Sequence, residues 1–111
     1  MAYDVELAAR IRALVAGEPG LTEQKMFGGI AFLVGGNMAL TASGRGGIMV
    51  RVDPDESDAL TVSTPATVMV MRGREMRGWL RIDAVHLQAQ SELAEWVERS
   101  VAFARSLPVK P

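Results

Sequence analysis

Apolar residues recur at helical spacing near both ends of the chain. From Leu7 to Val15 they occupy positions i, i+4, i+7 and i+8, and Asp4 precedes them as a candidate N-cap. A longer apolar stripe keeps the same period up to Pro108, where a helix must stop. The pattern therefore predicts one helix from Asp4 to about Val15, and a last helix that begins within residues 84–91.

Between these helices the apolar residues alternate with polar ones or gather in short runs, which is typical of strands. The segment 25–40 reads as two strands joined by a Gly-Gly turn, with Gly28 and Gly29 inside the first strand. Paired glycines inside a strand allow a bulge or the close approach of another backbone. The pattern predicts further strands at 48–52, 67–71 and 78–83, with residues 72–77 connecting the last two.

A short helix is predicted directly after the third strand. Asp53 can cap it, and Pro54 suits the first helical position because the missing N–H would have no partner there. Glu56 stands where a capping box places its glutamate. We expect this helix to end at about Leu60.

The predicted order of elements is α-β-β-β-α-β-β-α. Short turns make neighbouring strands antiparallel, because a parallel connection needs a longer crossover. We therefore expect an α+β fold in two layers, with an antiparallel sheet of about five strands and the helices on one face. The length of 111 residues suits a single domain that spans residues 1–111.

Composition excludes several classes of protein. The net charge of -1 gives no overall field that would attract nucleic acid or an anionic membrane. The absence of cysteine rules out disulfides, thiolate nucleophiles and cysteine-bound metals. The sequence shows no signal peptide and no apolar stretch long enough to span a membrane, so we expect a cytoplasmic protein without a membrane partner.

The segment Lys25-Met26-Phe27-Gly28-Gly29 carries a family signature. Together with Met76, Gly78 and Trp79 in a later Met-x-Gly-Trp element, and with a last helix that ends in Leu-Pro, it resembles the N-terminal domain of the TfoX/Sxy family. The resemblance covers nearly the whole chain.

This resemblance implies a fold similar in layout to type III secretion chaperones and a role in regulating bacterial competence genes. Full-length regulators of the family carry a second, C-terminal domain, whereas this sequence stops directly after its last helix. The resemblance carries over no catalytic or cofactor-binding residue. It implies a regulatory or interaction module.

Catalytic and metal-binding patterns are missing. His86 is the only histidine, and no serine stands in a Gly-x-Ser-x-Gly elbow. The acidic residues from Asp53 to Asp58 lack the glycine and glutamate of a calcium-binding loop and favour a helix N-terminus instead. We therefore predict no catalytic residues, no cofactor and no bound metal.

The main candidate for a binding surface is a group of arginines around Trp79. Strand parity would place Arg77, Trp79 and Arg81 on one face, where a guanidinium can stack on the indole. With Arg72 and Arg74 in the preceding connection, this patch could bind phosphates and stack a base, or contact a protein partner. The alternative is that Trp79 fills the core while the arginines are solvated.

The sequence is compatible with three functions. The first is a non-enzymatic module that contacts a protein partner, including a second copy in a homodimer. It draws on the methionines at 69, 71 and 76, which either form an adaptable surface or fill the core. The second is nucleic-acid binding through the arginine patch. The third is a small-ligand binder or enzyme with a pocket between the sheet and the last helix, near Arg51, Asp53 and Glu75.

Overall fold

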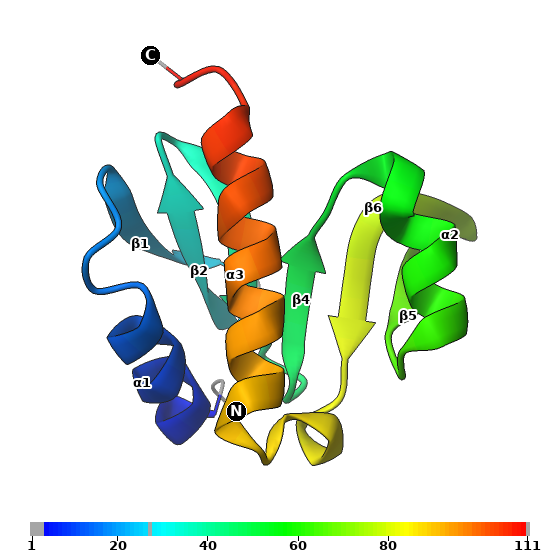
Figure 1. The fold of residues 1–111 in the computed structure, drawn as a ribbon. Helices are drawn as coiled ribbons and strands as arrows, with labels where there is room; N and C mark the ends of the chain where they lie inside the picture. Colours follow the sequence, from blue (N-terminus) through cyan, green and yellow to red (C-terminus); the bar gives the residue numbers. More distant parts are fainter. Residues whose placement is uncertain (1–3, 27, 111) are drawn as a thin grey trace.

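The structure is a computed structural model that describes residues 4–26 and 28–110. Figure 1 shows its elements along the chain. They are α1 (Val5–Leu14), β1 (Leu21–Met26), β2 (Gly29–Val34), β3 (Asn37–Ala42), β4 (Ile48–Arg51), α2 (Pro54–Ser63), β5 (Thr67–Met71), β6 (Arg74–Ile82), the 3-10 helix η1 (Ala84–Leu87) and α3 (Gln90–Ser106).

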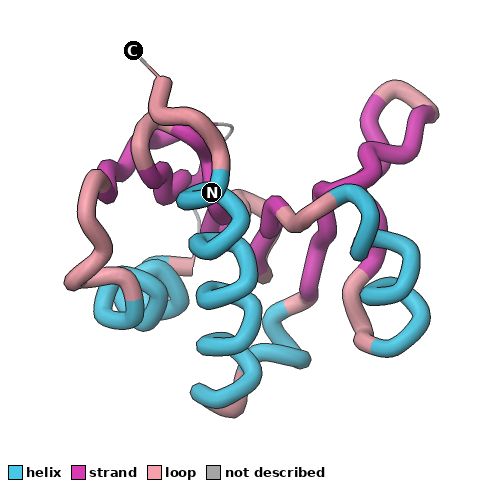
Figure 2. The backbone as a smooth tube through the Cα atoms, turned by 45° about the horizontal axis from the view of Figure 1, so that its top comes forward, coloured by secondary structure: helices cyan, strands magenta, loops and turns pink. Residues whose placement is uncertain are grey.

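These described residues form one six-stranded sheet in the order β1-β2-β3-β4-β6-β5. Every neighbouring pair is antiparallel. In Figures 1 and 2 the helices lie on one side of the sheet, with α3 across β2, β3 and β4, and α2 against β6 and β5. The predicted α+β class with an antiparallel sheet is confirmed. The likeness to secretion chaperones stays a prediction.

The hydrophobic core lies between the sheet and the helices. Phe32 and Leu80 from the strands are completely buried there, and Ile11 of α1 and Leu93 of α3 meet them from the other layer. These helical positions belong to the apolar stripes of the two predicted helices. Burial of such side chains is the main favourable term in folding, so the stripes determine which helix faces meet the sheet.

Both predicted N-caps are confirmed. The Leu7 N–H donates to Asp4 Oδ1 at 3.0 Å at the start of α1. Asp53 Oδ1 accepts at 2.9 Å from the N–H two residues further on, at the start of α2. The second helix runs to Ser63, beyond the predicted end at Leu60. The predicted start of α2 is therefore correct, and its end lies later in the chain than predicted.

The sheet has one strand more than predicted, because β1 is a separate element. The residues at 22–25 are exposed, and their polar side chains give no apolar alternation from which a strand could be recognised. Gly28 lies in the turn between β1 and β2, and Gly29 begins β2. The placement of both glycines inside one strand was therefore wrong. The order of elements becomes α-β-β-β-β-α-β-β-η-α.

The last strand also begins earlier than predicted. β6 starts at Arg74 and not at Gly78, so the connection from β5 is only the two-residue turn Arg72-Gly73. A short turn with a glycine is typical of a hairpin. Residues 74–77 therefore belong to a strand and not to a loop.

The C-terminal segment lies across the predicted Gly35-Gly36 turn, which is confirmed. The Lys110 N–H donates to the Gly35 carbonyl at 2.8 Å. The buried side chain of Asn37 donates to the Pro108 carbonyl at 2.9 Å. The end of the described chain is thereby attached to the β2–β3 hairpin.

We expect stability in acid to depend on Glu18. Its carboxylate accepts from Arg105 on α3 at 2.6 Å, and this hydrogen bond lowers the pKa of Glu18 from its ordinary value of 4.5. A lowered pKa in the folded state stabilises the protein above the unfolded pKa, and this contribution is lost as the pH falls through the folded value. Glu18→Gln should therefore lose less stability than the wild type on going from about pH 5 to pH 3, measured by urea denaturation.

Glu98→Gln is the matched control, because Glu98 is an exposed glutamate on α3. It removes a carboxylate from α3 without removing an ion pair of the described residues. The effect of Glu18→Gln should be small, because Arg105 is more than half exposed and solvent screens the pair. Identical pH dependences for Glu18→Gln and the wild type would contradict the assignment.

Candidate functional site

The strands β5 and β6 continue past the rest of the sheet as a two-stranded arm. β4 pairs with β6 only from Trp79 onward. β5 stays paired with β6 beyond this point, from the pair Met69–Met76 up to the turn. We define the arm as residues 69–76, and Figure 2 shows this hairpin projecting at the upper right. A ribbon of two strands cannot bury both of its faces by itself.

Gly78 marks the point where the arm leaves the sheet. The pairing of β5 with β6 jumps here, so that the β6 residues 77–79 have no partner in β5. Gly78 adopts a φ of 89°, which residues with a Cβ rarely adopt. Its carbonyl accepts from the Val52 N–H at 2.8 Å. A Cβ at Gly78 would lie 3.1 Å from the Val52 carbonyl oxygen and 3.2 Å from Pro54 Cγ.

The tip of the arm is a turn with two positive φ angles. Arg72 has a φ of 54° and Gly73 a φ of 78°, the signature of a type I′ hairpin turn. Among the described residues Arg72 is the only non-glycine residue with a positive φ. Its side chain is exposed. Backbone strain of this kind is often found at functional positions.

Apolar side chains of the arm face solvent. Val70 is 58% exposed, Met71 53% and Met76 36%. Of the two predictions for the methionines, the adaptable surface therefore fits Met71 and Met76, whereas Met69 is half-buried. Unbranched and polarisable, a methionine side chain adapts to partners of different shape.

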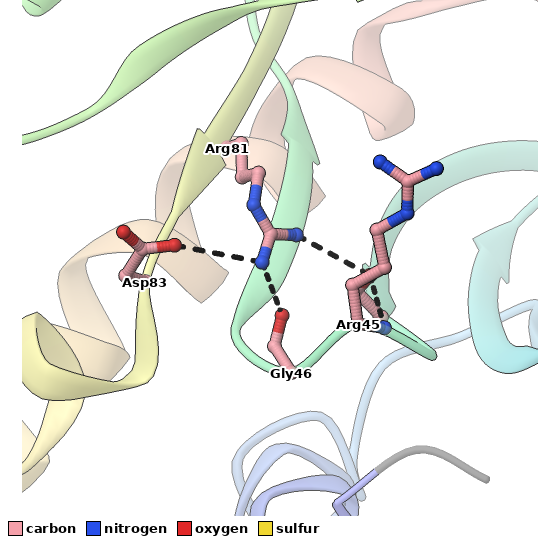
Figure 3. A network of polar contacts seen from close by, with 5 residues as sticks. Arg45, Gly46, Arg81 and Asp83 are labelled. Atoms are coloured by element: carbon pink, nitrogen blue, oxygen red, sulfur yellow. Dashed lines mark hydrogen bonds and ion pairs between the residues drawn. The ribbon is translucent and has the colours of Figure 1, made fainter. Parts of the chain in front are cut away.

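Arg81 does not take part in an exposed patch. Its Nη2 donates to the Gly46 carbonyl at 2.8 Å, and its Nη1 donates to Ser43 Oγ at 3.3 Å. The Asp83 carboxylate lies 3.5 Å from Nη2. Figure 3 shows these contacts converging on the guanidinium from the β3–β4 turn and from the end of β6. Arg81 thus holds this turn against β6.

Trp79 and Arg77 also contact the body of the molecule. The guanidinium over the Trp79 ring belongs to Arg51 of β4, 5.2 Å from the ring centroid, and it also lies 5.6 Å from the ring of Phe103 on α3. Arg77 donates to the Pro54 carbonyl at 3.0 Å. The residues of the predicted patch therefore do not share one surface. The guanidinium that stacks on the half-buried indole is that of Arg51, whereas Arg77 and Arg81 of β6 have other contacts.

Only Arg72 and Arg74 of the predicted patch lie on the arm. Both are exposed, and within the described part of the chain neither side chain has an ion pair. The arm therefore combines exposed apolar side chains with two cationic ones. Sequence reasoning named these arginines and methionines but did not find the ribbon that joins them.

The family signature at residues 25–29 lies at the β1–β2 hairpin, away from the arm. Phe27 is outside the described residues. Lys25 is exposed, Met26 is half-buried and Gly28 is exposed. Gly29 is buried against the end of β3, and a Cβ on it would overlap the carbonyl oxygen of Ala42. The close backbone approach expected of the glycine pair is confirmed at Gly29.

Two of the three residues of the small-ligand hypothesis have structural contacts. Arg51 stacks on aromatic rings, Asp53 caps α2, and Glu75 lies exposed on the arm. A cavity of about 150 Å³ is lined by residues of α2, η1 and α3, including His86 and Arg99. Within the described part of the chain no three histidine, aspartate or glutamate side chains gather closely enough to hold a metal ion.

The fold and the arm define a small α+β domain with an open antiparallel sheet. A family model of the TfoX N-terminal domain matches residues 13–104 of the 111 in this chain. The chain belongs to this family. A search of the curated proteins finds no match. No helix in the part of the chain that the structure describes has the length and apolar character needed to cross a bilayer.

Proposed function

We propose that this TfoX N-terminal domain is a non-enzymatic interaction module that acts in the cytoplasm, in the regulation of gene expression such as that of competence genes. It works by binding a protein partner through the arm. The observation that carries this proposal is the exposure of Val70, Met71 and Met76 on a ribbon that leaves the body of the molecule.

The position of β5 supports binding through backbone as well as side chains. β5 is an edge strand of the sheet, so the side of it that faces away from β6 presents unpaired N–H and C=O groups. A partner strand can add to such an edge by main-chain hydrogen bonds, while exposed side chains give specificity. The arm offers both kinds of contact in one short segment.

Nucleic-acid binding has less support. It needs the arginines and the tryptophan on one accessible surface, whereas Arg81 is bonded to the β3–β4 turn and the indole of Trp79 stacks against Arg51. The exposed arginines Arg72, Arg74 and Arg77 offer three phosphate contacts, which give weak binding at physiological salt. We therefore favour a protein partner.

Photocrosslinking in cells that naturally contain the protein tests this proposal. A benzophenone amino acid replaces Met71 on the arm or, as a control, Val85 on η1, which is similarly exposed at 64%. We expect irradiation to give a discrete protein adduct from position 71 and none from position 85. The absence of a discrete adduct at position 71 would overturn the proposal, and so would an adduct that nuclease digestion removes.

A further inference from the structure

We propose that the partner of the arm is a second copy of this chain, joined by antiparallel pairing of β5 with the β5 of its partner. This inference rests on the proposed function, because it names the occupant of the same surface. The two sheets become one continuous sheet with a two-fold axis through the centre of the β5 pair. Four features of the strand support this occupant: the difference between the two sheet edges, the register, the charges and the size.

The two edges of the sheet differ in how they are protected. β1, at one edge, carries Glu23 and Lys25, and Arg12 holds the Glu23 carboxylate at 2.7 Å. β5, at the other edge, has the sequence Thr-Val-Met-Val-Met without a charged residue. Charged side chains are a common device against unwanted strand pairing. Only the β5 edge is therefore open to another strand.

A five-residue strand pairs with its own copy in full when its middle residue lies on the axis. For β5 this residue is Met69, which then faces the partner's Met69. Val68 faces the partner's Val70, and Thr67 the partner's Met71. Cross-strand pairs of β-branched and apolar side chains are favourable. Pro65 limits the pairing at one end, because it has no N–H to donate.

The charges in this register are compatible with a second copy. The two Arg72 side chains come to lie at opposite ends of the strand pair, so that like charges do not meet. Each Arg72 faces the partner's Ala66, next to the segment that leaves the carboxyl end of the partner's α2. That helix end has no basic residue in its last turn. The negative end of a helix dipole is favourable for a cation, so Arg72 supplies the missing charge.

The size of the contact predicts a weak dimer. Two five-residue strands bury less than the ~1,200 Å² that is usual for stable complexes. We therefore expect association with a dissociation constant on the order of tens of micromolar. The dimer should form and separate with concentration.

Sedimentation velocity on the purified full chain tests the association. The wild type should shift from monomer to dimer between about 5 µM and 500 µM. Val70→Lys places a charge on the open edge and should stay monomeric throughout this range. Val85→Lys, the same change at a similarly exposed valine on η1, should behave as the wild type. Circular dichroism checks that all three proteins are folded.

Single cysteines test the register, since the natural chain has none. Directly opposed residues of antiparallel strands have Cα atoms about 4.5–5.5 Å apart, which suits a disulfide. Met69→Cys should therefore form a covalent dimer under mild oxidation. The two Met71 positions would lie about 13 Å apart, so Met71→Cys should crosslink at least about ten times more slowly. Equal rates on non-reducing gels would overturn this register.

Failure of self-pairing and failure of the interaction module give different results. A wild type that stays monomeric at the highest concentration, or a Val70→Lys variant that dimerises like the wild type, overturns pairing through β5. If photocrosslinking at position 71 then captures a different protein, the arm still binds a partner and only its identity was wrong. If position 71 captures nothing, the interaction module fails as well.

Discussion

Gly29→Ala should lower the free energy of unfolding by about 3 kcal/mol, which is a large part of the stability of a domain of this size. The new Cβ would overlap the carbonyl oxygen of Ala42 and lie 3.1 Å from the Gly44 backbone nitrogen. Both obstacles are backbone atoms, which cannot turn away as a flexible side chain can. The variant must therefore shift the end of β3 or lose its pairing with β2. Urea denaturation followed by circular dichroism measures the change.

Gly17→Ala is the control for this prediction. A Cβ at Gly17 meets no heavy atom within 4 Å, and its φ is not positive. This variant should be neutral or gain up to about 1 kcal/mol from reduced freedom of the unfolded chain. A loss of less than about 1 kcal/mol in Gly29→Ala would show that the hairpin yields easily. The glycine of the family signature would then need another explanation.

Gly78→Ala should destabilise the protein by about 2 to 3 kcal/mol. About 1 to 2 kcal/mol of this comes from a positive φ at a residue with a Cβ. The rest comes from the crowding of the new methyl group between the Val52 carbonyl and the Pro54 ring. Because the Gly78 carbonyl accepts from the Val52 N–H, a shift of β6 here also weakens the attachment of the arm. Thermal and urea unfolding measure the effect.

Gly73→Ala separates these two contributions. Gly73 also has a positive φ, of 78°, but a Cβ there meets no atom within 4 Å. It should show only the backbone cost of about 1 to 2 kcal/mol. An equal loss in the two variants would mean that the contacts with Val52 and Pro54 contribute nothing.

The local signals of the sequence were reliable where they act within a few residues. Asp4 and Asp53 predicted the two N-caps because capping needs only the next few backbone N–H groups. The alternation of Ile48 and Val50 predicted β4, and both are fully buried. These features depend little on the rest of the chain.

The edge strand β1 could not be recognised in the same way. Its side chains at 22–25 are exposed and polar, and they pair with β2 through the backbone. Such pairing needs no apolar pattern and leaves none in the sequence. The two-stranded arm was missed for a related reason. Gly78 reads as the start of a strand, whereas it is the bend within one.

Among the predicted site residues, those whose partners are distant in sequence were the ones misplaced. Strand parity grouped Arg77 and Arg81 with Trp79, but the bend at Gly78 and the β3–β4 turn give these arginines other contacts. Arg51 reaches the indole from β4, nearly thirty positions away in the chain. The contacts of Arg77 and Arg81 and the stacking of Arg51 all depend on which strands pair, and a single sequence does not show this pairing. Arg72 and Arg74 are exposed at the turn, as in the alternative in which these arginines are solvated, and their role in binding stays a prediction.

The charged β1 edge limits how far assembly can proceed. Growth into a fibre needs two sheet edges on each molecule that can pair with a strand of a neighbour. This chain offers one such edge, because the charged residues Glu23 and Lys25 lie on the other. In the dimer that we propose, pairing of two copies through β5 would therefore use the one open edge and end the assembly at two chains. Removing the charges from β1 would then create a second open edge, through which dimers could join into a fibre.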